Sequence, residues 1–156
     1  MWAALGRLDA AAGRWSGVTV WTLACAWALG FAVLCAGKLR FFLYQDFDLA
    51  LFAQAIHGAL RGSFASSIRG MPWLADHSSL VLVPLAPLAA LVPAPLLLVI
   101  LQCAALALGA PVVHRLARRE LGSPSAALAL ALAWLLQPGL GYVALFEFHP
   151  ETLAVP

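Results

Sequence analysis

The chain has 156 residues, of which 63% are hydrophobic and 10% are charged, and its mean hydropathy is +0.92. Soluble domains average about 25% charged and about 45–50% apolar residues, and a chain this short has too little interior to hide so much apolar surface from water. The composition therefore excludes a soluble globular domain. The formal net charge of +2 is too small and too dispersed for nucleic-acid binding, so we expect no nucleic-acid partner.

Three long apolar stretches predict transmembrane helices, at residues 15–37, 95–117 and 124–142. Each is close to or above the roughly 20 helical residues that cross the hydrocarbon core of a bilayer. A cleaved signal peptide is the competing interpretation of the first stretch, but that stretch exceeds the usual h-region of about 7–15 residues. We therefore expect a first helix that stays in the membrane.

The segment between the first two predicted spans, residues 38–94, is more polar and is predicted to be an external loop. Within it, apolar residues at helical spacing over 48–61 predict a helix lying in the membrane interface, and residues 63–77 are predicted to be loop. Residues 78–91 would reach about 21 Å as a helix, too short to cross comfortably, and they contain Pro84 and Pro87. This piece is predicted to be a re-entrant or juxtamembrane helix.

The basic residues favour one topology under the positive-inside rule. The N-terminus (1–14) and the turn at 118–123 become cytoplasmic, whereas 38–94 and 143–156 become external. If residues 78–91 crossed the membrane instead, the basic cluster formed by Arg115, Arg118 and Arg119 would lie outside. The last apolar segment stops at Pro156 after too few residues to cross. The predicted fold is an all-α integral membrane protein with about three full transmembrane helices, interfacial and re-entrant helices, and the start of a fourth span.

Three short polar motifs fall on the external face of this topology: Tyr44 to Asp48, Asp76-His77, and Phe146 to Glu151. Carboxylates close to lipid are costly and are usually functional. Asp46 and Asp48 are two residues apart, so they offer oxygens to a divalent cation such as Mg²⁺ or Mn²⁺, or one acts as a general base. His149 would complete a mixed ligand set with them.

Helix capping is the alternative interpretation of the same motifs. Asp46 or Asp48 stands where an N-cap of the 48–61 helix belongs, and Asp76 or the serines after it would cap the 78–91 helix. In His149-Pro150-Glu151, the proline suits the first helical position and Glu151 favours a helix N-terminus. The external cations Arg61 and Arg69 are candidates for binding a lipid-linked phosphate, and headgroup anchoring explains them equally well.

These motifs resemble those of a bacterial family of predicted membrane proteins, domain of unknown function 2079. Asp46 to Ile56 is similar to its "FDLxxFxQAxW" motif, Asp76-His77-Ser78 to its "DHxSP" motif, and Phe148 to Pro156 to its "FHPExLAVP" motif. The order and spacing agree from about Gln45 to the end of the chain, and Ser79 departs from the family's proline. The resemblance implies a multi-pass protein of the bacterial plasma membrane, of which this chain is an N-terminal fragment.

The family is similar in layout to the C-type glycosyltransferases, which use polyprenyl-phosphate sugars and carry an acidic motif in the first external loop. The resemblance thus implies a glycosyltransferase-like enzyme acting at the external face, with membrane lipid, a polyprenyl-phosphate sugar and the missing C-terminal spans as partners. Asp46 and Asp48 would be catalytic and, with His149, would hold the metal. Residues expected to bind substrate are Asp76, His77, Arg61, Arg69 and Glu151. The alternative is a non-catalytic membrane protein, a transporter or assembly subunit, in which the motifs only cap helices.

Overall fold

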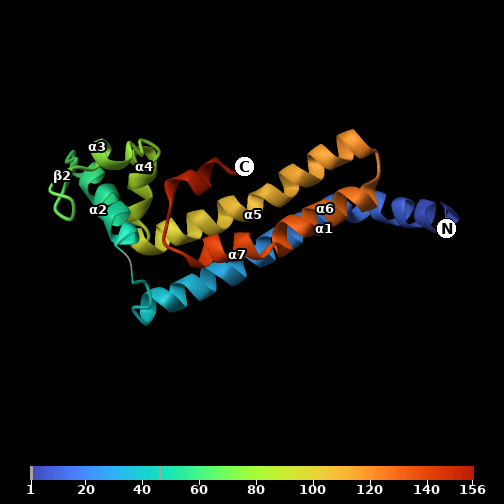
Figure 1. Cartoon of the computed structure of the whole chain (residues 1–156), viewed down its shortest axis with the longest axis horizontal. Helices are drawn as coiled ribbons and strands as arrows, with labels where there is room; N and C mark the ends of the chain where they lie inside the picture. Colours follow the sequence, from blue (N-terminus) through green and yellow to red (C-terminus); the bar gives the residue numbers. More distant parts are fainter. Residues whose placement is uncertain (1, 46) are drawn as a thin grey trace.

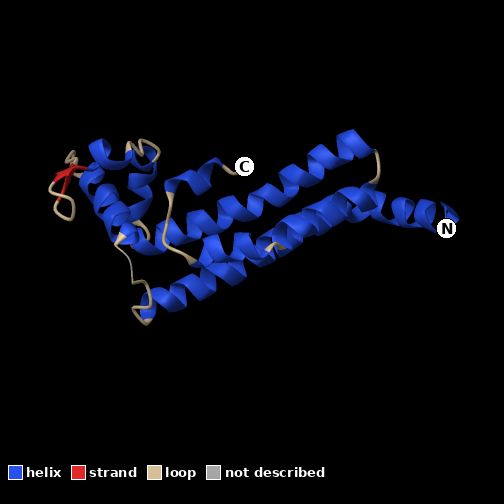
Figure 2. Cartoon of the chain, viewed as in Figure 1, coloured by secondary structure: helices blue, strands red, loops and turns tan. Residues whose placement is uncertain are grey.

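The computed structural model describes the backbone of residues 2–45 and 47–156, and the side chains of residue 13, of residues 15–45 and of residues 47–156 (Figure 1). Helices make up most of this part of the chain, and the two strands have two residues each (Figure 2). The all-α prediction is therefore confirmed for the described residues. Asp46, the first candidate catalytic residue, lies outside them.

Three long rods lie along the long axis of the molecule (Figure 1). They are α1 (Trp2–Arg40), α5 (Ala94–Leu121), and the successive helices α6 (Pro124–Leu136) and α7 (Pro138–Leu145). The segments Trp15–Arg40 and Ala94–Leu121 are long and apolar enough to cross a membrane, and α6 with α7 makes a third candidate if the bent pair counts as one span. The described residues thus supply two candidate spans, or up to three.

Proline explains the 43° bend between α6 and α7. Gln137, between the two helices, is extended (φ −66°, ψ 130°), and Pro138 opens α7. A proline disfavours helical backbone at the residue before it and has no N–H to donate. Helix α5 also continues past residue 117, where its predicted span ends, because no further glycine or proline occurs before Gly122, whose φ of +65° ends α5 in the left-handed region.

Small side chains bring the rods close together. Buried alanines line the contacts among α1, α5 and α6, and small residues are the usual means by which membrane helices approach one another. These alanines are Ala24, Ala107, Ala110, Ala127 and Ala131. At Gly109 of α5 the indole of Trp134 lies so near that an added Cβ would be 2.5 Å from the ring, and Trp134 Nε1 donates to the Leu106 carbonyl at 2.9 Å.

The polar segment folds into a compact group of short elements at one end of the bundle (Figure 1). Its elements are α2 (Asp48–Leu60), β1 (Ala65–Ser66), β2 (Met71–Pro72), α3 (Trp73–His77), α4 (Leu82–Leu85) and the 3₁₀ helix η1 (Ala86–Ala90). The strands pair antiparallel, with Ala65 opposite Pro72 and Ser66 opposite Met71. Residues 63–77, predicted to be loop, thus contain a small hairpin and a helical turn.

The helix predicted over 78–91 is shorter than expected. Ser78 has a φ of +46°, which ends α3, and helical backbone resumes at Leu82. Pro84 and Pro87 lack the N–H groups that a regular α-helix would use, and the second half tightens into the 3₁₀ helix η1. The last element, η2 (Pro150–Ala154), is a 3₁₀ helix packed against α5 in the region where a fourth span was expected to start.

The apolar face of α2 is covered by protein. Leu49, Phe52 and Ile56 are each at most 5% exposed, and α2 contacts α4, η1 and α5. The pattern that predicts an amphipathic helix is therefore satisfied by core packing, and the depth of α2 in a membrane stays a prediction. This packing fixes the N-terminal end of α2 beside the segment that follows α7.

Candidate functional site

The N-terminus of α2 is capped by a residue distant in sequence. Phe47 is the N-cap and makes no side-chain cap. Instead, the Leu49 amide donates to Oε2 of Glu147 at 2.6 Å, and Glu147 is only 3% exposed. A carboxylate is well placed there because the helix N-terminus carries unsatisfied N–H groups and partial positive charge. The capping interpretation of Asp48 is thus wrong, and its side chain is directed elsewhere.

A second buried polar residue, Gln102 of α5, holds the segment that carries Glu147. Its Nε2 donates to the carbonyls of Val143 (2.9 Å) and Glu147 (3.3 Å). Its Oε1 accepts from the His149 amide (2.9 Å) and the Thr152 hydroxyl (3.3 Å). These four bonds use the full capacity of a primary amide. The turn from α7 into η2 is therefore anchored to α5.

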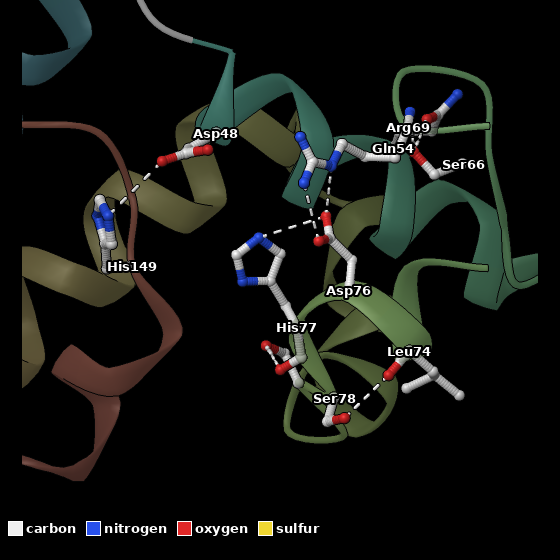
Figure 3. Close-up of polar contacts among 10 residues, drawn as sticks. Asp48, Gln54, Ser66, Arg69, Leu74, Asp76, His77, Ser78 and His149 are labelled. Atoms are coloured by element: carbon white, nitrogen blue, oxygen red, sulfur yellow. Dashed lines mark hydrogen bonds and ion pairs between the residues drawn. The ribbon is translucent and has the colours of Figure 1, made fainter. Parts of the chain in front are cut away.

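This anchoring places His149 beside Asp48. Nε2 of His149 lies 3.6 Å from Oδ2 of Asp48, and the side chains are 41% and 32% exposed (Figure 3). The two residues come from the first and third predicted motifs and are brought together by folding. Both remain accessible from outside the helical core.

The imidazole of His149 is oriented by its other nitrogen. Nδ1 lies 3.0 Å from the carbonyl oxygen of Glu147, and since a carbonyl only accepts, Nδ1 must carry the hydrogen. In the neutral ring, Nε2 then presents a lone pair toward the carboxylate of Asp48. Two acceptors face each other, so the pair calls for a proton, a hydroxyl donor or a cation between them.

Beside this pair lies a second polar group from the hairpin and α3. Arg69 binds Asp76 through two hydrogen bonds, Nε to Oδ2 at 2.8 Å and Nη2 to Oδ1 at 3.1 Å, and Nε2 of His77 lies 3.5 Å from the same carboxylate (Figure 3). The hydrogen bonds between Arg69 and Asp76 lower the pKa of Asp76 and raise the pKa of Arg69, and the negative charge of Asp48 adds a smaller contribution to the raised pKa of Arg69. Arg69 thus lies within the electrostatic influence of both carboxylates.

Gln54 of α2 positions the hairpin that carries Arg69. Its Oε1 accepts from the Ser66 hydroxyl and the Ser67 amide, both at 3.1 Å, and its Nε2 donates to the Ser67 hydroxyl at 2.6 Å. The Ser66 hydroxyl in turn accepts from the Arg69 amide at 3.3 Å. Figure 3 shows the contact between Gln54 and Ser66 beside the Arg69–Asp76 pair.

Aromatic contacts connect the two groups. The Phe52 ring lies 5.0 Å from the His77 ring and 5.6 Å from the Phe148 ring, centroid to centroid. The His149 ring stacks on Phe146 at 5.7 Å. The three motifs therefore share one packed unit, which we call the polar site: Asp48, Arg69, Asp76, His77 and His149.

Two predicted residues lie elsewhere. Arg61 follows the last residue of α2, at the other end of the helix from Asp48, about 20 Å along the axis at about 1.5 Å per residue. Glu151 lies in the first turn of η2, exposed, with Pro150 in the first helical turn as the sequence predicts. Asp46 is outside the described part of the chain, so its predicted catalytic role stays a prediction.

The residues that sequence reasoning missed are those that build the site: Gln54, Gln102 and Glu147. Gln102 carried a detectable signal, since it is a lone amide within a long apolar helix, and polar residues inside membrane spans usually face a partner. Glu147 belongs to the third motif, but nothing in the sequence relates it to the amide of Leu49. Only the fold reveals that contact.

A divalent metal fits the polar site in part. Among the described residues no three His, Cys, Asp or Glu side chains come together closely enough to hold a metal ion. Asp48 and His149 supply one carboxylate and one imidazole, a set that suits Mn²⁺ better than Mg²⁺, which prefers oxygen ligands.

The fold and the site define a helical membrane protein with a polar site at one end of its apolar bundle. The comparison with family models matches residues 38–156 to a family described as predicted membrane protein (DUF2079). The chain belongs to this family, as the motifs indicate. No curated protein and no solved structure matches it.

Proposed function

We propose that the chain forms part of a membrane-bound transferase that moves a sugar from a polyprenyl-phosphate carrier to a hydroxyl acceptor at the external face. The observation that supports it best is the Asp48–His149 pair, in which Nε2 of His149 faces a carboxylate across 3.6 Å. A hydroxyl beside the pair would donate its one hydrogen to one of these acceptors. The proposal adopts the glycosyltransferase-like function that the resemblance implies.

In the proposed reaction the acceptor hydroxyl gives its proton to the Asp48–His149 pair as its oxygen attacks the anomeric carbon. The bond between that carbon and the carrier phosphate breaks, and the carrier leaves as the lipid phosphate. Arg69 is the best-placed described cation for that phosphate, because its bonds to Asp76 use Nε and Nη2, and its side chain is 42% exposed. Arginine suits phosphate through charge-assisted hydrogen bonds.

The alternative to a proton acceptor at this pair is a divalent ion held by Asp48, His149 and Asp46, which would supply charge neutralisation for the leaving phosphate. One carboxylate and one imidazole suit Mn²⁺ rather than Mg²⁺, because Mg²⁺ prefers oxygen ligands. We expect Mn²⁺ binding, followed by electron paramagnetic resonance, to be lost in Asp48→Asn and in His149→Ala. A retained signal in both variants would remove the metal from the proposal.

Turnover of radiolabelled polyprenyl-phosphate sugars by membranes containing the protein tests the activity itself. Asp48→Asn and His149→Ala should each lower turnover by about a hundredfold or more, the usual contribution of a general base. Matched controls are Glu120→Gln at the other end of the bundle and His57→Ala on the exposed face of α2. Turnover that is unchanged in Asp48→Asn would overturn the assignment.

A structural role is the second candidate, and the Glu147 cap and the Gln102 anchor favour it, since both serve to hold segments together. In that case the protein is a non-catalytic membrane component, a transporter or assembly subunit. Asp48→Asn and His149→Ala would then lower thermal stability with no sugar turnover in the unmodified protein. The same set of variants thus separates the two functions.

A further inference from the structure

The end of the bundle opposite the polar site contains a cavity between α1 and α5. It has a volume of about 240 Å³ and lies beside the last turns of α5. Its lining residues include Gly17, Trp21, Pro111, His114, Arg115 and Arg118. The cavity is therefore partly apolar and strongly basic.

Two of its polar groups are buried without a partner. Nε2 of His114 and Nη1 of Arg118 have no hydrogen-bond partner among the described residues, although neither atom is open to solvent. A buried N–H group left unpaired costs free energy, and a charged group costs more. No ion pair joins His114, Arg115 or Arg118 to a described carboxylate. The cavity is thus a site that calls for an acceptor bearing negative charge.

We propose that this cavity binds the phosphate of an anionic phospholipid. Arg118 and Arg115 offer guanidinium groups, which bind phosphate in planar, charge-assisted geometry. Basic pockets between membrane helices are a known means of holding anionic headgroups, and indole rings such as that of Trp21 favour the headgroup level of a bilayer. Phosphate supplies the acceptor oxygens that Arg118 lacks, and it accepts from Nε2 of His114 in the tautomer that carries its hydrogen there.

The surroundings favour a lipid over a soluble anion. Trp21, which lines the cavity, is 47% exposed, and Val112 and Leu116 on the same turns of α5 are 41% and 59% exposed, so apolar surface lies near the cavity. Gly17 presents no side chain, and a Cβ added there would meet nothing within 4 Å, which leaves a path for the headgroup. Acyl chains would cover the apolar surface while the phosphate occupies the cavity. This site is independent of the proposed sugar transfer.

Native mass spectrometry of the detergent-purified protein with added phosphatidylglycerol tests the proposal. The informative variant is Arg118→Gln, and the matched control is Arg119→Gln, an exposed neighbour with the same charge change. A second pair of variants leaves the charge unchanged. Gly17→Val places a side chain at the opening of the cavity, and Gly30→Val adds the same groups at another open position of α1. Circular dichroism confirms that each variant remains helical.

We expect the unmodified protein, Arg119→Gln and Gly30→Val to retain one phosphatidylglycerol. Arg118→Gln and Gly17→Val should weaken binding about tenfold or more, as expected for the loss of a charge-assisted hydrogen bond or of access. Equal loss in Arg118→Gln and Arg119→Gln would reduce the effect to general charge and overturn the site. Equal retention of phosphatidylcholine, or displacement by millimolar inorganic phosphate, would overturn the assignment to an anionic lipid.

Discussion

At the residue scale, the polar contacts of this protein are made between distant segments of the chain. Glu147 caps a helix that begins almost a hundred positions earlier, and the amide of Gln102 bonds four groups between Val143 and Thr152. Such contacts follow from tertiary packing, so motif spacing cannot reveal them. The sequence did identify Asp48 and His149 as candidates, because acidic and histidine residues beside apolar helices are uncommon.

The Arg69–Asp76 pair gives a pH dependence with a definite sign. Hydrogen bonds from Arg69 hold the pKa of Asp76 below its ordinary value of 3.8. A carboxylate with a lowered folded-state pKa stabilises the fold above its ordinary pKa, and this contribution is lost as the pH falls through the lower folded-state value. The hairpin should therefore be held near neutral pH and loosen below about pH 3.8.

Hydrogen exchange of the amides of residues 66–71, corrected for the intrinsic pH dependence of exchange, measures this loosening. Protection should decrease severalfold between pH 5 and pH 2.5 in the unmodified protein, a range chosen to bracket the ordinary carboxylate pKa of about 3.9. In Asp76→Asn the protection should be low at both pH values and show no step. A step that persists in Asp76→Asn would assign the effect to another carboxylate.

At the element scale, Gly109 determines how closely α5 and α6 approach. Gly109→Ala would place a methyl group 2.5 Å from the Trp134 ring, closer than real side chains come. Overpacking of this kind usually costs about 1–3 kcal/mol. We expect the variant to lower the thermal unfolding temperature in detergent, even though alanine favours helix by about 1 kcal/mol over glycine.

Gly30→Ala is the matched control for this prediction, because a Cβ at Gly30 meets nothing within 4 Å and should be neutral or stabilising. Trp134→Phe supplies the second test, since a smaller ring should remove part of the penalty of Gly109→Ala in a double-mutant cycle. An unfolding temperature for Gly109→Ala equal to that of Gly30→Ala would contradict the proposed close contact.

Elements that depend on local sequence pattern were predicted better than elements that depend on tertiary contacts. Apolar length located the long helices, and helical periodicity located α2, because both depend on local pattern. The hairpin at 65–72 escaped prediction, since its strands have two residues each and depend on Gln54 for their position. The helix expected over 78–91 overran its true start because Ser78 adopts left-handed backbone, a conformation that its residue type does not indicate.

At the scale of the whole molecule, the two ends of the bundle differ in chemistry. The polar site lies at the end that holds α2 to η1, and the basic cavity lies at the other end. The positive-inside rule predicts that the first end is external and the second cytoplasmic. The three-rod arrangement thus gives a definite expectation for labelling from outside the cell.

Thiol labelling of intact cells measures this orientation. Cys25 is exposed and would be replaced, whereas Cys35 and Cys103 are fully buried and remain in place. An impermeant maleimide should label Ala65→Cys directly and Glu120→Cys only after the membrane is permeabilised. Both positions are exposed in the fold, so access depends on the membrane. Labelling of both without permeabilisation would contradict the topology.

The four bonds of Gln102 have a consequence for the order of assembly. If α5 enters the bilayer as it is synthesised, it does so before the residues that satisfy this amide, because those residues follow some forty positions later. The helix must then hold an unsatisfied polar group in an apolar solvent, which costs free energy. Arrival of α7 and η2 removes that cost. We therefore expect the segment from α7 to η2 to fix α5 in place only after that segment has been synthesised, and the polar site to be completed at that step.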